Sequence, residues 1–140
     1  MKSFFLVCIA SALILAGAAG CQTAMTSDSL SGDWDLIELG GKPVELAEAE
    51  KPPTISFDDD RQRVEGFAGC NTYFGDYVLA GSSLTFGPLG STRMACPGSE
   101  ENIETAYLAS LRQTTAWRIK GGKLQLLAKD VILARFKPAP

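Results

Sequence analysis

Four cysteines are the residues whose chemistry the sequence points to first. Cys8 lies in an apolar N-terminal run and Cys21 follows a run of small residues, which leaves Cys70 and Cys96. In an exported chain, two remaining cysteines predict one disulfide, Cys70–Cys96. A reactive thiol is an alternative, but it needs a nearby cation or a C-x-x-C partner. Arg93 is close to Cys96 in sequence, and no C-x-x-C is present. An unpaired, inert pair is the third interpretation.

The first twenty residues have the order of a secretory signal peptide. Lys2 supplies a positive charge, residues 4–15 are apolar, and residues 16–20 are small. The apolar run of about twelve residues is too short for a membrane-spanning helix, which needs roughly twenty. We therefore predict that residues 1–20 are a signal peptide.

Cys21 stands where a bacterial lipoprotein carries the cysteine that is acylated and becomes the new N-terminus. Ala18-Ala19-Gly20-Cys21 resembles such a lipobox, although leucine is the commonest residue at the position of Ala18. Cleavage after Ala16-Gly17-Ala18 is the competing interpretation. The small and polar residues 21–29 favour lipidation, because they suit a flexible tether after the acylated cysteine. We expect the folded domain to cover residues 30–137.

Two further features indicate where the protein is located and what it binds: the residue after Cys21 and the net charge of the mature chain. Gln22 is not the aspartate that favours inner-membrane retention in enteric bacteria, so we expect an outer-membrane lipoprotein facing the periplasm. Residues 21–140 carry 12 basic and 16 acidic side chains, a net charge of −4. This acidic balance argues against nucleic acid and fits poorly with direct adhesion to anionic lipid. We expect a monomer held by its lipid, with another envelope protein as the candidate partner.

The absence of histidine excludes several kinds of site, including Ser-His-Asp triads, Cys-His pairs and histidine metal centres. Asp58-Asp59-Asp60 lacks the alternating ligands and closing glutamate of a calcium loop, so we interpret it as a hairpin turn. The acidic side chains leave a paired-carboxylate glycosidase site open in principle, but nothing singles out one pair. We expect no enzymatic activity, no metal and no cofactor.

Residue alternation and turn residues predict an α+β fold of about eight strands and one helix. The predicted strands are residues 33–39, 54–57, 61–67, 73–79, 84–86, 116–119, 124–127 and 131–136, with a short edge piece at 42–44. A helix capped by Ser99 is predicted to end near residue 112 or 113. Within it, Ile103, Tyr107 and Leu111 recur at every fourth position. These elements predict a curved antiparallel sheet or open barrel packed on one helix.

Two segments near the cysteines hold candidate functional residues. Asn71, close to Gly69, suits a left-handed turn position that presents Cys70. Ser91, Thr92 and Arg93 join a strand to the helix, and a disulfide at Cys96 would hold them in place. A loop fixed in this way is a candidate contact surface. The other interpretation is that these three residues have a structural role, shaping the segment where the chain enters the helix.

Acidic residues open the predicted helix. Glu100, Glu101 and Glu104 suit the positive end of the helix dipole. Glu100 or Glu101 also offers an ion-pair partner for Arg93, and such an exposed pair contributes only about 0–1 kcal/mol. On that interpretation Arg93 serves the helix entry rather than a partner.

Three stretches in a fixed order resemble the META-domain family, also called HslJ-like, of bacterial envelope proteins and lipoproteins. They are residues 69–77 (GCNTYFGDY), 84–89 (LTFGPL) and 91–96 (STRMAC), followed by the acidic start of a helix. The resemblance covers roughly residues 30–137 and implies a β-rich fold with one helix. The family name is linked to heat-shock induction and novobiocin resistance, and its biochemical activity is not established.

Taken together, these features predict a non-enzymatic envelope lipoprotein that serves envelope integrity or stress tolerance. One alternative is a protein-binding module that inhibits an envelope enzyme or chaperones an outer-membrane component. The other is a carrier that holds a small amphiphile inside an open barrel. A large apolar cavity would favour the carrier, whereas a filled core with an exposed loop would favour the binding module.

Overall fold

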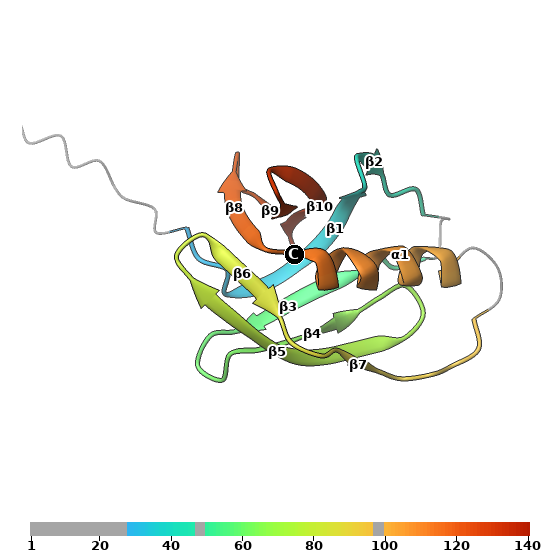
Figure 1. Ribbon diagram of the computed structural model, residues 1–140. Helices are drawn as coiled ribbons and strands as arrows, with labels where there is room; N and C mark the ends of the chain where they lie inside the picture. Colours follow the sequence, from blue (N-terminus) through green and yellow to red (C-terminus); the bar gives the residue numbers. More distant parts are fainter. Residues whose placement is uncertain (1–27, 47–49, 97–99) are drawn as a thin grey trace, which may run out of the picture.

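The computed structural model describes residues 28–46, 50–96 and 100–140. The predicted signal peptide, the predicted lipidation site Cys21 and the predicted cap Ser99 lie outside these residues. Within them, ten strands and one helix form an antiparallel sheet that curves into a ring (Figure 1). This arrangement confirms the predicted α+β class and the curved sheet. None of the described helical residues forms a segment long and apolar enough to cross a membrane.

The elements are short strands joined mostly by tight turns, with the helix late in the chain. They are β1 (Gly32–Leu39), β2 (Lys42–Pro43), β3 (Thr54–Asp58), β4 (Arg63–Phe67), β5 (Thr72–Ala80), β6 (Ser83–Phe86), β7 (Gly90–Ser91), α1 (Glu100–Gln113), β8 (Ala116–Lys120), β9 (Lys123–Ala128) and β10 (Val131–Pro138). β2 matches the predicted edge piece, whereas β7 was not predicted.

Strand pairing closes the sheet on itself. The order is β10-β9-β8-β6-β5-β4-β3-β1, and β1 also pairs with β10. The thinnest seam lies between β6 and β8, which pair only at Ser83 and Ala116. α1 packs against β6, β9 and β10 and buries Tyr107 and Leu111. The result is a ring with one thin seam rather than an even barrel.

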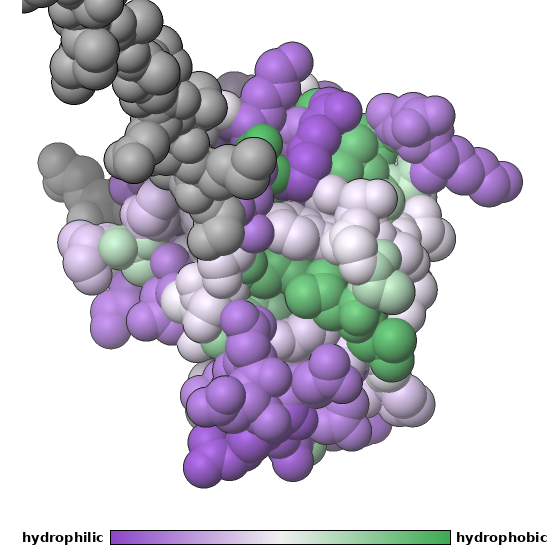
Figure 2. Space-filling model, turned by 90° about the vertical axis from the view of Figure 1, so that its left-hand side faces the viewer, coloured by the Kyte–Doolittle hydropathy of each residue, from purple (hydrophilic) through white to green (hydrophobic). Residues whose placement is uncertain are grey.

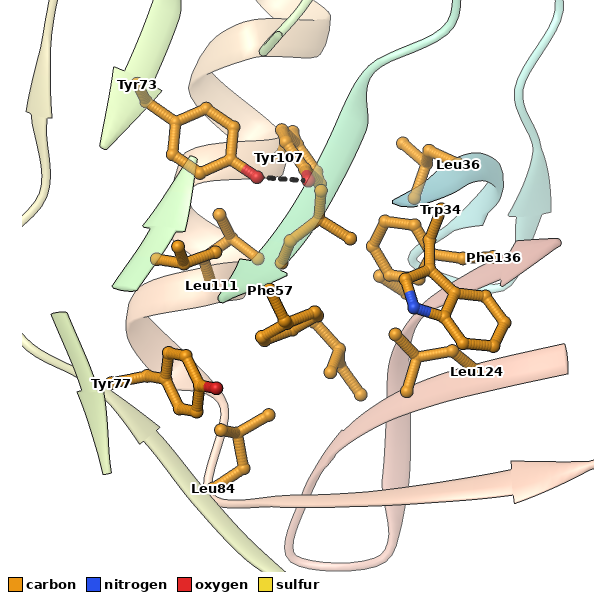
Figure 3. Close-up of a cluster of buried hydrophobic side chains, with 14 of the residues drawn as sticks. Trp34, Leu36, Phe57, Tyr73, Tyr77, Leu84, Tyr107, Leu111, Leu124 and Phe136 are labelled. Atoms are coloured by element: carbon orange, nitrogen blue, oxygen red, sulfur yellow. Dashed lines mark hydrogen bonds between the residues drawn. The ribbon is translucent and has the colours of Figure 1, made fainter. Parts of the chain in front are cut away.

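Apolar side chains fill the inside of the ring (Figure 3). β5 shows how the sequence pattern produces this core, because Tyr73 and Tyr77 are buried while Phe74 and Val78 between and beyond them are exposed. Aromatic rings from different elements meet edge to face, as between Tyr107 and Phe136, whose centroids are 6.2 Å apart. Burying a large apolar side chain contributes about 1.5–3 kcal/mol. This core therefore provides the rigid frame for both ends of the ring.

Two buried tyrosines replace a strand hydrogen bond at one end of the β3–β4 pair. β3 and β4 pair only through residues 56–58 of β3, which leaves the Thr54 carbonyl beyond the ladder. The Tyr73 and Tyr107 hydroxyls lie 2.9 and 3.0 Å from this oxygen and 2.9 Å from each other (Figure 3). A Cβ on Gly66 would overlap the same oxygen, so glycine is needed there. Burial raises the pKa of both phenols, which therefore stay neutral at physiological pH.

Two local expectations need correction. Gly69, with φ of 123°, takes the left-handed position of its turn, and Asn71 is not among the residues with positive φ. Glycine lacks a Cβ and adopts this conformation without steric cost. β1 is also less regular than its alternation suggests, since its pairing with β10 shifts register between Leu36 and Glu38. Such an irregularity locally changes which side chains oppose each other.

Candidate functional site

Three segments meet at one end of the ring, which we call the clamp end. It comprises Cys70, Asn71, Thr92, Met94, Cys96 and Glu104. Cys70 and Cys96 form a disulfide with their Cα atoms 6.0 Å apart. The bond ties the turn before β5 to the segment that leads from β7 towards α1. The structure thus brings together the two cysteines that the sequence leaves over.

Glu104 anchors the turn that carries Cys70. One carboxylate oxygen accepts the N–H of Asn71 at 2.7 Å and the N–H of Cys70 at 3.3 Å. The other oxygen accepts the side-chain amide of Asn71 at 2.9 Å. Hydrogen bonds to an ionised group are stronger than those between neutral groups. The helix therefore holds the turn through one carboxylate, a role more specific than the predicted interaction with the helix dipole.

Asn71 links this turn to the segment between β7 and α1. Its side-chain oxygen accepts the N–H of Met94 at 2.7 Å and the hydroxyl of Thr92 at 3.0 Å. Its side-chain nitrogen also lies 3.4 Å from the carbonyl of Met94. The residue is only 5% exposed, and a buried amide whose groups are all bonded makes its surroundings rigid. This role of Asn71 was not predicted from the sequence. The available signal was an amide residue directly after a disulfide cysteine.

Thr92 belongs to the clamp end rather than to a free contact surface. Its N–H donates to the carbonyl of Thr72 at 3.0 Å, and its hydroxyl accepts the N–H of Thr72 at 3.2 Å. The same hydroxyl donates to Asn71. Thus the Thr92 side chain is exposed but already used to hold the loop against β5.

Ser91 lies in β7, which has a free edge, and Arg93 follows two residues after it. β7 pairs with β5 and, among the described strands, with none on its other side. The Thr92 amide donates to β5, so the amide of Ser91, the preceding residue in β7, points away from β5. The Arg93 guanidinium is exposed and has no hydrogen bond or ion pair within the described residues. The side chains of Glu100 and Glu101, its predicted alternative partners, lie outside what the structure describes.

Two exposed apolar side chains adjoin this edge. Phe74 is 51% exposed and Met94 is 61% exposed. Phe74 lies against Gly90 of β7, because a Cβ there would come within 2.8 Å of the ring. Aromatic and methionine side chains are enriched at protein interfaces. The edge therefore combines unpaired backbone groups, a cation and apolar contact area.

A cleft of 260 Å³ opens beside the same turn. Its lining comprises Leu46, Glu50, Lys51, Pro53, Phe67, Gly69 and Ile103. Sites for drug-sized ligands typically measure about 300–1,000 Å³. A wider hollow of 470 Å³ lies over β3, β4 and β5 and is lined largely by polar residues. The cleft thus suits one apolar side chain of a partner better than a whole amphiphile.

The aspartates of the β3–β4 turn bind protein groups. Arg61 donates to Asp58 at 2.7 Å, and this hydrogen bond lowers the pKa of the Asp58 carboxyl. Asp59 accepts the hydroxyl of Tyr77 at 2.7 Å. Across residues 28–46, 50–96 and 100–140, no three Cys, Asp or Glu side chains come together in a way that would hold a metal ion. The turn thus has the geometry of a hairpin connection.

Comparisons with known proteins identify what the chain resembles. The model of the META-domain family matches residues 15–140. An NMR structure of a protein from Burkholderia xenovorans is 28% identical with a TM-score of 0.60, covering 78% of this chain and 82% of that one. A crystal structure of a DUF4847 family protein from Bacteroides vulgatus is 16% identical with a TM-score of 0.55. That match covers 78% of this chain and 93% of the other, and shows a shared fold alone. A search of the curated proteins found no match.

Proposed function

Because the chain belongs to the META-domain family, we propose that it is a lipid-anchored envelope protein that binds another protein through its clamp end. The chain is exported, acylated on Cys21 and held at the outer membrane, facing the periplasm. The contribution to envelope integrity or stress tolerance is made by binding, without catalysis. The signal-like residues 1–20 and the small-residue run before Cys21 support the export and the anchor.

The observation that carries the binding role is the fixed, unpaired edge of β7 beside Arg93. An edge strand presents N–H and C=O groups that an extended peptide can pair with. The disulfide and the Asn71–Glu104 contacts already hold this backbone, which lowers the ordering cost of binding. The planar guanidinium of Arg93 suits a carboxylate. The ligand chemistry that fits is an extended peptide with an acidic side chain.

The core supports binding over carriage of an amphiphile. The largest buried side chains, among them Tyr73, Tyr107 and Phe136, are less than 2% exposed and occupy the interior of the ring. The clefts at the clamp end and over β3–β5 lie at the surface of the described chain. A carrier would use an enclosed apolar volume of several hundred Å³. The filled ring is the arrangement that favours a protein-binding module.

Arg93→Glu in the full-length protein tests the binding role. Arg93 has no partner within the described residues, so stability should change by less than about 0.5 kcal/mol. In vivo crosslinking with mass spectrometry should show at least a tenfold loss of captured partner, together with lost complementation. Arg112→Glu, an exposed arginine in the last turn of α1, is the matched control and should keep both. Unchanged partners and complementation in Arg93→Glu would refute the contact surface.

Cys21→Ser tests the anchor separately. This variant should lose fatty-acid labelling and leave the membrane fraction, because a lipobox cysteine is the acylated residue. The control is the wild-type chain labelled in the same cells. A wild-type protein that is already soluble and unlabelled would contradict the lipoprotein assignment without affecting the test of Arg93.

A further inference from the structure

Four cations gather at the end of the ring opposite the clamp end. We call this group the basic tip: Arg118, Lys120, Lys123 and Lys137. Lys120 and Lys123 face each other across the β8–β9 hairpin. The pairing of Phe136 with Leu124 places Lys137 beside Lys123 on the next strand. All four side chains are exposed.

No side chain of the basic tip forms an ion pair within the described residues, although Asp35 lies opposite Lys137 across the β1–β10 pair and Arg118 donates to the Gln125 side chain. The ion pairs found there involve Arg61, Arg63 and Arg135. Like charges placed directly opposite each other destabilise an antiparallel pair, so Lys120 and Lys123 disfavour the hairpin that carries them. Residues 112–129 hold five basic and no acidic side chains, in a chain whose net charge is −3. This segment is thus basic in an acidic chain, and three of its five cations, Arg118, Lys120 and Lys123, belong to the basic tip.

The chain enters the domain beside the basic tip. Asp28 lines one shallow hollow together with Trp117, Arg118 and Ile119. Seven residues lead from Cys21 to Asp28, a span of at most about 25 Å when fully extended. An acyl chain on Cys21 would therefore keep Asp28, which adjoins Arg118 of the basic tip, within that distance of the bilayer surface.

We infer that the basic tip docks on the anionic headgroups of the membrane to which the lipid attaches; this rests on the proposed anchor at Cys21. Basic residues near a bilayer are attracted to anionic lipid over about one Debye length. The net charge of the mature chain argued against such contact, but the distribution of charge in the fold favours it on one rim.

The charged groups at this end of the ring also determine how the domain is oriented on the membrane. The start of β1 pairs with the ends of both β3 and β10, so the Asp58–Asp60 turn and the basic tip share this end. Figure 2 shows this end, with hydrophilic side chains at its upper and lower rims and an apolar strip between them. An anionic surface attracts the β8–β9 rim and repels the acidic turn. The domain therefore lies on β8 and β9, and the clamp end points away from the bilayer.

The test uses the mature lipoprotein purified from cells that express the full-length chain. It is reconstituted into vesicles of phosphatidylcholine alone, or with one-third phosphatidylglycerol. A membrane-impermeant amine reagent and mass spectrometry then measure the labelling rate of each lysine. Lys120, Lys123 and Lys137 should be labelled at least fivefold more slowly on the anionic vesicles. Lys42 in β2 and Lys129 in the β9–β10 turn, both at the opposite end, should be labelled equally on both.

Reversing the charge of two lysines in the basic tip, or of two lysines at the opposite end, gives a matched pair of variants. Lys120→Glu with Lys123→Glu should abolish the protection of Lys137, whereas Lys42→Glu with Lys129→Glu should keep it. Equal labelling of the wild-type tip on both kinds of vesicle would overturn the inference. If soluble heparin slowed the labelling of the tip lysines equally on neutral vesicles, the basic tip would be a site for a soluble polyanion. That result would also overturn the inference.

Fatty-acid labelling of Cys21 is scored in the same preparations, so the two proposals fail separately. A labelled chain with an unprotected tip keeps the anchor and overturns the docking. An unlabelled chain that still sediments with anionic but not neutral vesicles, and loses this with Lys120→Glu and Lys123→Glu, overturns the anchor and supports the docking.

Discussion

The clamp end and the basic tip use charge in opposite ways. At the clamp end, the single carboxylate of Glu104 accepts three N–H groups that the backbone and Asn71 hold in place. At the basic tip, four cations stand together without an ion pair in the described residues. An ionised group stabilises a fold when its partners are fixed by the fold itself. Where the fold provides no partner, the charge remains available to an external ligand.

Removing the disulfide should have the largest effect on stability and would show what the clamp end depends on. Cys70→Ala with Cys96→Ala opens a loop with a sequence separation of 26 and should lower the free energy of unfolding by about 3 kcal/mol. Urea unfolding of the oxidised wild type and the double variant measures this, with intact-mass analysis to verify the bond. Two freely alkylated thiols in the unreduced native protein would contradict the pairing.

Glu104→Ala should have the next largest effect, because it leaves two backbone N–H groups and the Asn71 amide without their acceptor. We expect a loss of about 2–3 kcal/mol in the free energy of unfolding, from the cost of unsatisfied partly buried donors. Glu104→Gln keeps one acceptor oxygen and should lose about half as much. Thr105→Ala, at the exposed neighbouring position, is the control. An equal loss in Thr105→Ala and Glu104→Ala would mean that the helix, and not the carboxylate, is responsible.

Tyr107→Phe tests the buried phenols that support the clamp end from the core. Removing one hydroxyl should lower the free energy of unfolding by about 1–1.5 kcal/mol at pH 7. Burial raises the pKa of Tyr73 and Tyr107 above the ordinary value of 10.0, so above this pH the unfolded chain releases protons that the folded chain keeps. Stability is therefore fully present below pH 10 and falls as pH rises beyond it.

The free energy of unfolding of the variant should fall less steeply above pH 10, by up to about 1.4 kcal/mol per pH unit, because the Tyr107 phenol no longer titrates. The pKa of Tyr77 is also raised, by burial and by its hydrogen bond to Asp59, and this tyrosine contributes equally in both proteins. Urea unfolding between pH 8 and pH 11.5 measures both slopes. Identical slopes in the wild type and Tyr107→Phe would refute the assignment of this alkaline transition to the tyrosine pair.

Lys123→Glu should have the smallest effect and the opposite sign. It converts a like-charged pair across the β8–β9 hairpin into an opposite-charged one, which should raise the free energy of unfolding by about 0.2–1 kcal/mol without lipid. Lys42→Glu, where no such pair exists, is the control. A loss of stability in Lys123→Glu would show that the tip cations already have favourable partners in the fold and would remove the contrast between the two ends.

The parts of the fold that depend on local pattern could be predicted. The alternation around Tyr73 and Tyr77 gave the inner face of β5, and the four-residue spacing of Tyr107 and Leu111 gave the buried face of α1. β7 escaped prediction because two residues carry no periodicity, and the strand exists only through its pairing with β5. The family resemblance was also visible in local motifs, and the match to residues 15–140 confirms it.

What the sequence determined by itself was the set of residues with chemical potential: four cysteines, no histidine, a signal-like N-terminus and strands with one apolar face. Only the tertiary structure decided how those residues meet. Asn71 and Glu104 are 33 positions apart, and the Thr54 carbonyl meets Tyr107 from 53 positions away. Lys137 joins Lys120 and Lys123 only because β10 pairs with β9. Hydrogen bonds and charge act over a few ångströms in space, and the closed ring sets which distant residues come that near.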